Sequence, residues 1–299
     1  MAPTVPTAVV DFQHNAFLTE IRNDWTSSNW PVACSNCKSN EDRGYTSRRQ
    51  GANRWYMDHK LHNQTVELVR IDYWTGDLCN LACAICGPDN SSVWKQELGL
   101  PERKTIANKF WKDLDLSKLR HVHFNGGEPL LSKEHVEFLR AIPNKAQVQI
   151  NYNTNGTVRP SADLLALWQE FELVLLDFSI DDVSNRFEYQ RYHSVWDDVV
   201  DNLQWIITAA PHNCMFAVNT TVSILNQANL AELDAWLSTN FAVSRFRDPI
   251  EHRKQQVWGV LSTTGVAQDQ AKYLDRLDQR RGTDWRTTFP ELVSKLEHR

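Results

Sequence analysis

Five strand-like runs separated by helix-like stretches constrain the fold of this chain most. The runs cover residues 66–74, 121–125, 146–154, 173–181 and 216–223. Apolar residues recur at spacings of three and four in residues 132–142, 161–171, 195–209 and 227–239, as in helices. This alternation is typical of successive βαβ units, so the sequence predicts an α/β fold with a parallel sheet.

The strand-like runs have one apolar and one polar face. In residues 121–125, Val122 and Phe124 alternate with His121, His123 and Asn125, and the later runs keep this period. Parallel strands covered on both faces are normally apolar throughout. We therefore expect a barrel whose polar interior holds a hydrophilic substrate, because barrel strands alternate between the interior and the helical shell. Misphased strands, or an antiparallel sheet with one solvent face, is the alternative that the pattern leaves open.

Three segments are predicted along the 299 residues. Residues 1–64 show neither helical nor strand periodicity for long, and we expect an irregular N-terminal extension. Residues 65–245 should form the barrel, with a poorly marked sixth strand within 241–250. Residues 246–299 should form a short helical extension, with helices near 268–281 and 289–298.

Three of the six cysteines lie within eight positions, in the segment CNLACAIC of residues 79–86. Thiolates clustered on a loop after a strand can hold a soft metal centre. Structural zinc usually takes four protein ligands, and iron-sulfur clusters commonly take four cysteines. A loop with three cysteines therefore leaves one coordination position without a cysteine.

The neighbouring motifs favour one interpretation of this loop. Cys79, Cys83 and Cys86 form a Cx3Cx2C pattern, and the next strand runs into GGEP at residues 126–129. Together with later motifs in the same order, this resembles the radical S-adenosylmethionine (radical SAM) superfamily over residues 65–225. The resemblance implies a partial (β/α)6 barrel, a [4Fe-4S] cluster held by the three cysteines, and S-adenosylmethionine chelating the fourth iron.

The resemblance also implies contacts to the amino-acid end of S-adenosylmethionine. Gly126, Gly127 and Glu128 match the segment that binds the methionine amino group, and a glycine pair allows close backbone approach. Arg191 stands where relatives carry an arginine for the methionine carboxylate, which suits a planar guanidinium.

The resemblance implies contacts to the rest of the cofactor from three further segments. The segment YNTNGT puts Thr154 and Asn155 near the adenosyl moiety, and FSIDD puts Ser179 and Asp181 at the ribose or methionine side. Relatives often have an aromatic residue over the adenine between the second and third cysteines. This chain has Ile85 there, which retains an apolar contact.

A second pair of cysteines, Cys34 and Cys37, lies outside the predicted barrel. Three interpretations stay open: a second iron-sulfur cluster with Cys214, a zinc site with His59 and His62, or ordinary thiols. Residues 33–49 resemble an N-terminal segment of the SPASM/twitch branch, whose members modify peptides or proteins and often carry an auxiliary cluster in a C-terminal extension. The chain departs from that pattern, because it has no cysteine after Cys214.

The expected function is an enzyme that makes a 5'-deoxyadenosyl radical and abstracts hydrogen from a polar substrate. The branch resemblance implies a peptide or protein side chain as substrate, and a flavodoxin or ferredoxin as electron donor. The alternatives are modification of a nucleotide or nucleic acid, with an anion-binding strip at Arg43, Arg48, Arg49 and Arg54, and a non-catalytic iron-sulfur protein.

Charge and hydropathy limit the partners. A formal charge of -5 and a pI near 6.1 argue against a broad basic surface for nucleic acid, although a local patch remains open. The sequence shows no signal peptide or membrane-spanning stretch, so we expect a cytoplasmic protein without a membrane partner.

Overall fold

The computed structural model describes residues 15–61, 67–101, 109–241, 255–256 and 261–297. The chain divides into two compact units. The first comprises residues 1–68 with 110–115, and the second comprises residues 69–109 with 116–299. The second unit contains the sheet and the three clustered cysteines.

A five-stranded sheet in which every neighbouring pair is parallel forms the centre of the second unit, in the order β1-β3-β4-β5-β7. Its strands are β1 (Arg70–Trp74), β3 (His121–Asn125), β4 (Gln149–Thr154), β5 (Leu173–Phe178) and β7 (Cys214–Val218). All five predicted strands are present, but the one predicted at 216–223 is displaced. The strand of the sheet is Cys214–Val218, and Thr221–Val222 belong to a separate strand pair. The prediction for β4 began too early, because Lys145–Gln147 form a 3-10 turn before the strand.

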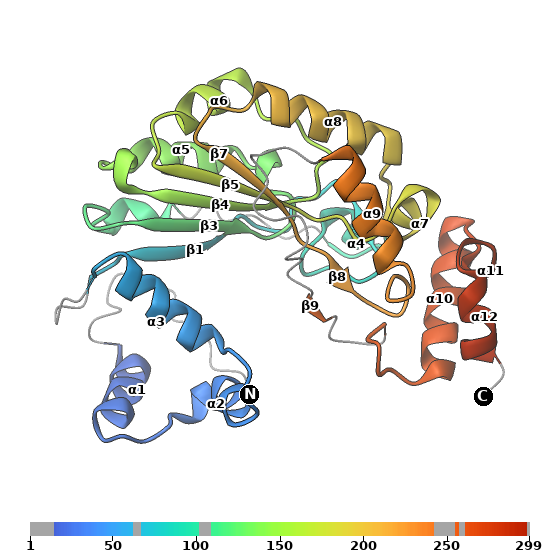
Figure 1. Ribbon diagram of the computed structural model, residues 1–299, viewed down its shortest axis with the longest axis horizontal. Helices are drawn as coiled ribbons and strands as arrows, with labels where there is room; N and C mark the ends of the chain where they lie inside the picture. Colours follow the sequence, from blue (N-terminus) through green and yellow to red (C-terminus); the bar gives the residue numbers. More distant parts are fainter. Residues whose placement is uncertain (1–14, 62–66, 102–108, 242–254, 257–260, 298–299) are drawn as a thin grey trace. The chain divides into compact units, whose positions relative to one another are not determined.

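Helices α5 (Lys133–Ala141), α6 (Ala162–Trp168) and α8 (Trp196–Ala209) cover one face of this sheet (Figure 1). Phe138 of α5 packs edge-on against Phe124, with ring centroids 6.1 Å apart, and Trp168 of α6 packs against Tyr152 at 5.4 Å. Phe124 and Tyr152 therefore belong to the helix-covered face. Since successive strand residues point to opposite faces, His123 and Asn151 belong to the other face, which we call the concave face.

A separate, short strand pair follows β7 in the chain. β8 (Thr221–Val222) pairs in parallel with β9 (Gln255–Gln256). The predicted sixth strand at 241–250 lies outside the described residues except for residue 241. Helix α9 (Leu230–Asn240) precedes that gap, close to the predicted 227–239.

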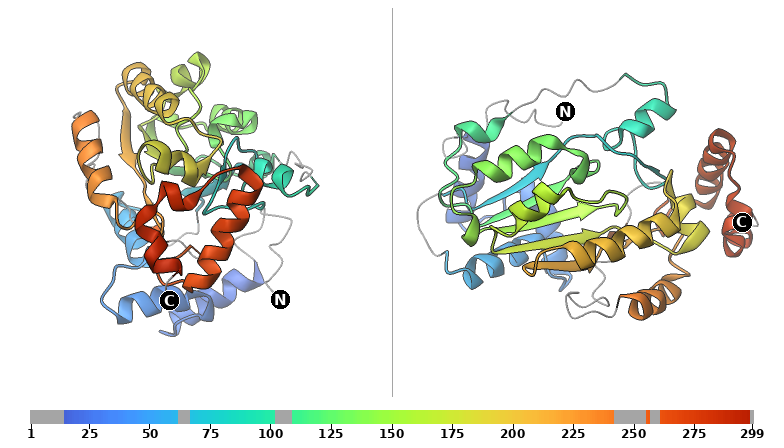
Figure 2. Two further views of the ribbon diagram at one scale, coloured as in Figure 1. Left: turned by 90° about the vertical axis from the view of Figure 1, so that its right-hand side faces the viewer. Right: turned by 90° about the horizontal axis from the view of Figure 1, so that it is seen from above.

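The predicted helices near the C-terminus are confirmed as α10 (Ala267–Arg281) and α12 (Pro290–Glu297), with the short α11 (Trp285–Thr288) between them. Figure 2 shows them in red, with α10 and α12 side by side. Their buried side chains form one apolar core with the cysteine loop, including Ala82, Ala84, Tyr189, Leu274 and Phe289. Among the described helices, none combines the length and apolar composition that crossing a bilayer requires.

The cysteine loop is also held by short elements that sequence periodicity did not predict. β2 (Ala82–Cys83) pairs in antiparallel fashion with β6 (Arg191–Tyr192), which follows α7 (Ser184–Gln190). Helix α4 (Ser92–Glu97) comes directly after the loop. These elements are two to seven residues long, so none spans enough turns or pleats to show a period.

The first unit is helical where the sequence predicted an irregular segment. It contains α1 (Ala16–Thr26), α2 (Ser35–Asp42) and α3 (Arg48–Asp58), and none of the three has a fully buried residue. Polar interactions stabilise the helix ends instead: Asn15 caps α1, and Ser47 forms a capping box with Gln50 on α3. Helices α2 and α3 have no apolar stripe, so their sequences show no helical period. Helix α1 does have apolar residues at helical spacing, Leu18, Ile21 and Trp25, which the prediction missed.

Candidate functional site

A cavity of about 480 Å³ lies where the segments after β1, β3, β4 and β5 meet. Cys79, Cys83 and Cys86 line it together with Ile85. The site is therefore at the carboxyl ends of parallel strands, where open α/β sheets usually bind ligands.

The backbone of the cysteine loop is held in place by its neighbours. Ser92 donates its hydroxyl to the Cys79 carbonyl at 2.9 Å, and the indole of Trp94 donates to the Cys83 carbonyl at 2.9 Å. Both donors belong to α4, whose N-cap is Ser91. Helix α4 thus holds the backbone of Cys79 and Cys83, and both residues line the cavity.

All three thiols are free and partly buried. Burial raises the pKa of each, and that of Cys83 to about 12. The guanidinium of Arg191 opposes this rise, with Nη1 4.0 Å from Cys83 Sγ. The thiolates that a metal centre needs would therefore form together with metal binding, with release of protons.

The chain needs the two glycines after β3 because this segment packs closely against the segment after β1. Gly127 N–H donates to the Gly76 carbonyl and Glu128 N–H to the Leu78 carbonyl, both at 2.8 Å. A Cβ on Gly127 would overlap the Leu78 carbonyl, and Gly126 has a φ of +129°, which disfavours other residues. The pair therefore locks the segment before Cys79 against the end of β3, and both glycines also line the cavity.

Glu128 binds the end of β4. Its carboxylate accepts hydrogen bonds from Thr154 Oγ1 at 2.9 Å, Asn155 N at 2.7 Å and Leu130 N at 3.0 Å. The side chain is buried, with 1% exposed, and it does not line the cavity. The structure thus shows a carboxylate that joins the segments after β3 and β4.

Thr154 and Asn155 both line the cavity. The Asn155 amide donates to Asn80 Oδ1 at 3.0 Å and lies 4.0 Å from Cys79 Sγ. The segment after β4 therefore contacts the cysteine loop directly.

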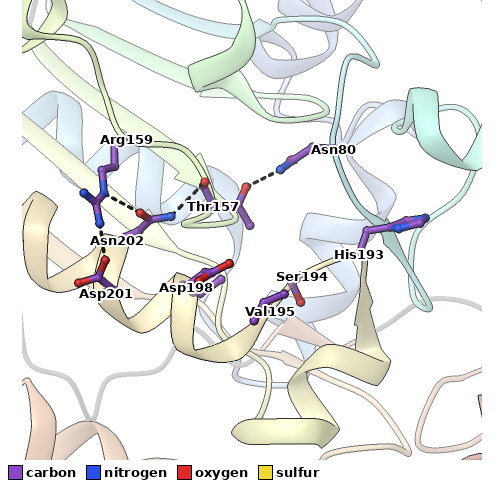
Figure 3. Close-up of a pocket in the computed structure, with 10 residues that line it drawn as sticks. Asn80, Thr157, Arg159, His193, Ser194, Val195, Asp198, Asp201 and Asn202 are labelled. Carbon is purple, nitrogen blue, oxygen red and sulfur yellow. Dashed lines mark hydrogen bonds and ion pairs between the residues drawn. The ribbon is translucent and has the colours of Figure 1, made fainter.

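A second pocket of about 370 Å³ lies on the other side of this contact. Figure 3 shows the polar chain that lines it: Asn80 donates to Thr157 Oγ1 at 2.7 Å, Asn202 donates to the Thr157 carbonyl at 3.1 Å, and Arg159 donates to Asn202 and Asp201. These bonds tie the segment after β4 to the cysteine loop and to α8.

Arg191 lines the cavity and forms an ion pair with Asp181, which lies behind the lining. Its Nη2 is 2.7 Å from Asp181 Oδ2, and Asp181 also accepts from Thr221 N at 2.8 Å. Burial lowers the pKa of Arg191 and the Asp181 carboxylate raises it, with a net rise, so the guanidinium stays charged. Its buried Nε has no hydrogen-bond partner in the described part of the chain. Arg191 and Ser179 line the cavity, whereas Asp181 does not.

The sequence matches the Radical SAM superfamily over residues 75–228, which is more than half of the chain and contains all the motifs above. The chain belongs to the radical SAM superfamily. Members of this superfamily use a [4Fe-4S] cluster and S-adenosylmethionine. A comparison with curated proteins found no match.

Two solved radical SAM structures are similar to the chain at low identity. Streptococcus suis SuiB bound to precursor peptide SuiA is 14% identical, with a TM-score of 0.48 and coverage of 87% of this chain and 64% of SuiB. Native anSMEcpe with bound AdoMet and Cp18Cys peptide is 15% identical, with a TM-score of 0.43 and coverage of 72% and 59%. The chain thus spans less than two thirds of the length of either structure.

The residues present fit the two radical SAM cofactors. The cavity has three free thiols, which are suitable ligands for iron, and a buried guanidinium with an unpartnered donor, which is suitable for a carboxylate. Of the predicted contact residues, all but Glu128 and Asp181 line the cavity. Those two residues lie behind the lining and hold Thr154, Asn155 and Arg191.

Sequence reasoning missed polar residues that also line the cavity of this radical SAM domain, among them Asn90, Asn125, Asn153 and Thr221. Asn125 and Asn153 are the last or next-to-last residues of β3 and β4 on the concave face. Their alternation with apolar residues was visible in the sequence, so strand phase combined with proximity to a motif could have identified them.

In the described parts of the chain, no three or more His, Cys, Asp or Glu side chains are arranged to hold a single metal ion. Cys79, Cys83 and Cys86 would instead hold a cluster of several irons. Cys34 and Cys37 lie at the start of α2, partly exposed. His59 Nδ1 donates to the Trp55 carbonyl at 2.8 Å, and His62 lies outside the described residues. Cys214 is fully buried on the helix-covered face of β7. The second metal site stays a prediction.

The arginine strip predicted for nucleic acid is partly engaged within the first unit. Arg49 pairs with Glu41 at 2.5 Å and lies over the rings of Trp25 and Trp30 at 5.3 and 5.0 Å. Its guanidinium is therefore already satisfied by an ion pair and two cation–π contacts.

Proposed function

We propose that this chain is a radical SAM enzyme that holds a [4Fe-4S] cluster through Cys79, Cys83 and Cys86. The observation that supports the proposal most is the pairing of these three thiols with Arg191 around one cavity. An iron-sulfur electron carrier has no need of a buried guanidinium with a free donor beside its cluster, whereas a cofactor carboxylate does.

The side chains of the cavity would divide the binding of S-adenosylmethionine. Arg191, held by Asp181, would bind the methionine carboxylate. Gly126 and Gly127 would offer backbone to the amino group, and Glu128 would act by positioning the segment after β4. In this proposal Thr154, Asn155, Ser179 and Ile85 line the nucleoside end, with Ile85 in apolar contact with the adenine.

When bound together and reduced by one electron, the two cofactors supply a 5'-deoxyadenosyl radical for hydrogen abstraction. The chain contributes orientation, and a polar concave face that would receive a polar substrate. The resemblance of residues 33–49 to the SPASM/twitch branch favours a peptide or protein side chain. The electron would come from a flavodoxin or ferredoxin, in a reducing compartment that keeps the thiols free.

Low-temperature electron paramagnetic resonance tests the proposal. Anaerobically reconstituted, reduced protein should show a cluster signal that changes when S-adenosylmethionine is added. Cys83→Ala should abolish the signal, and Cys214→Ala should retain it, because Cys214 is buried away from the cavity. A signal indifferent to S-adenosylmethionine would instead support an electron carrier, and the absence of a cluster would refute the proposal.

The same samples test the second metal site. If Cys34 and Cys37 are ordinary thiols, the double substitution Cys34→Ala with Cys37→Ala leaves the iron content at about four per chain, as expected for one cubane cluster. A fall in iron or zinc content on this double substitution would show that the pair binds metal.

A further inference from the structure

A row of polar side chains crosses the concave face of the sheet. Strands β1, β3 and β4 lie side by side (Figure 1). Asp72 of β1, His123 of β3 and Asn151 of β4 are register partners on them. The residues that follow them, including Phe124 and Tyr152, pack against the helices on the other face. The row therefore points into the barrel interior.

Two residues of this row, His123 and Asn151, each have one polar atom next to a carboxylate. His123 Nδ1 lies 3.6 Å from Asp72 Oδ1, and Asn151 Nδ2 donates to Asp177 Oδ2 at 3.0 Å. The contact with His123 lowers the pKa of Asp72 to about 2, so this carboxylate is ionised at neutral pH. An ionised carboxylate only accepts hydrogen bonds, which favours the proton of His123 on Nδ1 and orients the Asn151 amide.

The remaining polar atoms of His123 and Asn151 are therefore both acceptors. His123 Nε2 and Asn151 Oδ1 are buried, and neither has a hydrogen-bond partner in the described part of the chain. Asn151 is only 6% exposed. A buried acceptor without a donor is costly, so two of them on neighbouring strands indicate that a donor from outside the chain completes them.

His123 and Asn151 do not line the cysteine-lined cavity themselves, but residues one pleat further along their strands do. Asn125 and Asn153 line that cavity, and they stand two positions further along the same strands as His123 and Asn151. Two strand residues correspond to roughly 6–7 Å. A substrate group on the acceptors would thus leave the adjoining carbon chain at the edge of the cavity.

We infer that His123 and Asn151 together bind a cationic nitrogen group of the substrate, an ammonium or a guanidinium. Such a group supplies at least two N–H donors for two acceptors on adjacent strands. The Asp177 carboxylate beside Asn151 favours a positive charge over a neutral amide. Asp72 beside His123 adds less, because its carboxylate also pairs with Arg70 at 3.3 Å. This inference rests on the proposed function, because it specifies the substrate of the same site.

Equilibrium dialysis with defined probes tests the inference on the full, reconstituted protein with S-adenosylmethionine. The probes are N-acetyl-lysine amide and N-acetyl-arginine amide, with the neutral analogues N-acetyl-norleucine amide and N-acetyl-citrulline amide. We expect the cationic probes to bind at least roughly tenfold more tightly than their neutral analogues. Asn151→Leu and His123→Phe should each remove this preference.

Two variants separate binding from folding. Gln149→Leu makes the same kind of change on the same face of β4, two residues further from the cavity, and should keep the preference. Asn151→Asp retains the acceptor and should keep the preference, while it replaces the amide that donates to Asp177. Equal affinities for charged and neutral probes, or an unchanged preference in Asn151→Leu, would mean that the acceptors hold only water and would overturn the inference.

The dialysis result is independent of the proposed chemistry. If the proposed function alone fails, the spectrum of the reduced protein will not respond to S-adenosylmethionine, and the cationic preference will persist. If only the inference fails, the spectrum will respond and the preference will be absent.

Discussion

Two buried ionisable side chains near the cavity, Glu128 after β3 and Arg191 at β6, use their polar atoms differently. Glu128 accepts three hydrogen bonds from the chain itself and does not line the cavity. Arg191 pairs with Asp181, lines the cavity, and keeps Nε without a partner in the described residues. Burial alone thus does not distinguish a positioning residue from a ligand-binding one.

What separates the two is whether their hydrogen-bonding capacity is exhausted within the fold. A carboxylate whose oxygens are occupied by backbone and hydroxyl donors stabilises a loop, and its energetic effect appears in the free energy of unfolding. A guanidinium with a remaining donor beside a cavity can still gain energy from a ligand, and its effect appears in affinity. Substitution of Glu128 should therefore change mainly the free energy of unfolding, and substitution of Arg191 mainly the affinity for the ligand.

Arg191→Lys should have the largest effect on ligand binding. Lysine keeps the charge but lacks the planar fork that can bond Asp181 and a carboxylate at once. We expect the affinity for S-adenosylmethionine to fall by roughly 10–100-fold, the range given by loss of one charge-assisted hydrogen bond. Isothermal titration calorimetry on anaerobic reconstituted protein measures this.

Arg186→Lys is the matched control for that change. Arg186 also pairs with a buried aspartate, Asp182, at 3.0 Å, but does not line the cavity. Its substitution should leave the affinity for S-adenosylmethionine unaltered. An equal loss in both variants would show that Arg191 acts through general stability and would remove the contrast with Glu128.

Glu128→Gln should lower stability first and affinity second. The amide places a donor where Glu128 now accepts from Thr154, Leu130 or Asn155, so at least one buried group loses its partner. Such a loss costs about 1–3 kcal/mol of unfolding free energy. Denaturant unfolding of the cluster-free protein measures it. A loss of affinity with unchanged unfolding would instead make Glu128 a direct ligand of the methionine amino group.

The strands were predictable because they are long enough to show a period of two. β3, β4 and β5 were recognised from alternation that continues over five or six residues, whereas β7 shares only residues 216–218 with the predicted run. The helices of the first unit were not predicted. Helices α2 and α3 lack an apolar stripe, and capping by Ser47 stabilises α3 without a buried face. Local polar interactions of this kind leave no periodic pattern in a sequence.

The sequence predicted which residues belong to the candidate site. It did not predict which of them line the cavity and which lie behind the lining. Short motifs identified the cysteines, the glycine pair and Arg191, all of which line one cavity. No motif could tell that Glu128 and Asp181 lie behind the lining, because their orientation depends on partners 26 or more residues away, such as Thr154 and Thr221. The packing role of Gly127 likewise depends on Leu78, which comes close only in the folded chain.

Thr157→Val should have the smallest effect, and it tests whether the segment after β4 depends mainly on Glu128. The change removes the hydroxyl that accepts from Asn80 at 2.7 Å and donates to Asn155 Oδ1 at 2.6 Å, while the shape is retained. The bond from Asn80 is exposed, and Asn155 Oδ1 keeps the hydrogen bond from the Thr157 backbone N–H at 2.9 Å, so the loss should cost only about 1 kcal/mol of unfolding free energy. If the loss instead equals that of Glu128→Gln, the contact of Asn80 with Thr157 fixes this segment as much as the buried carboxylate does.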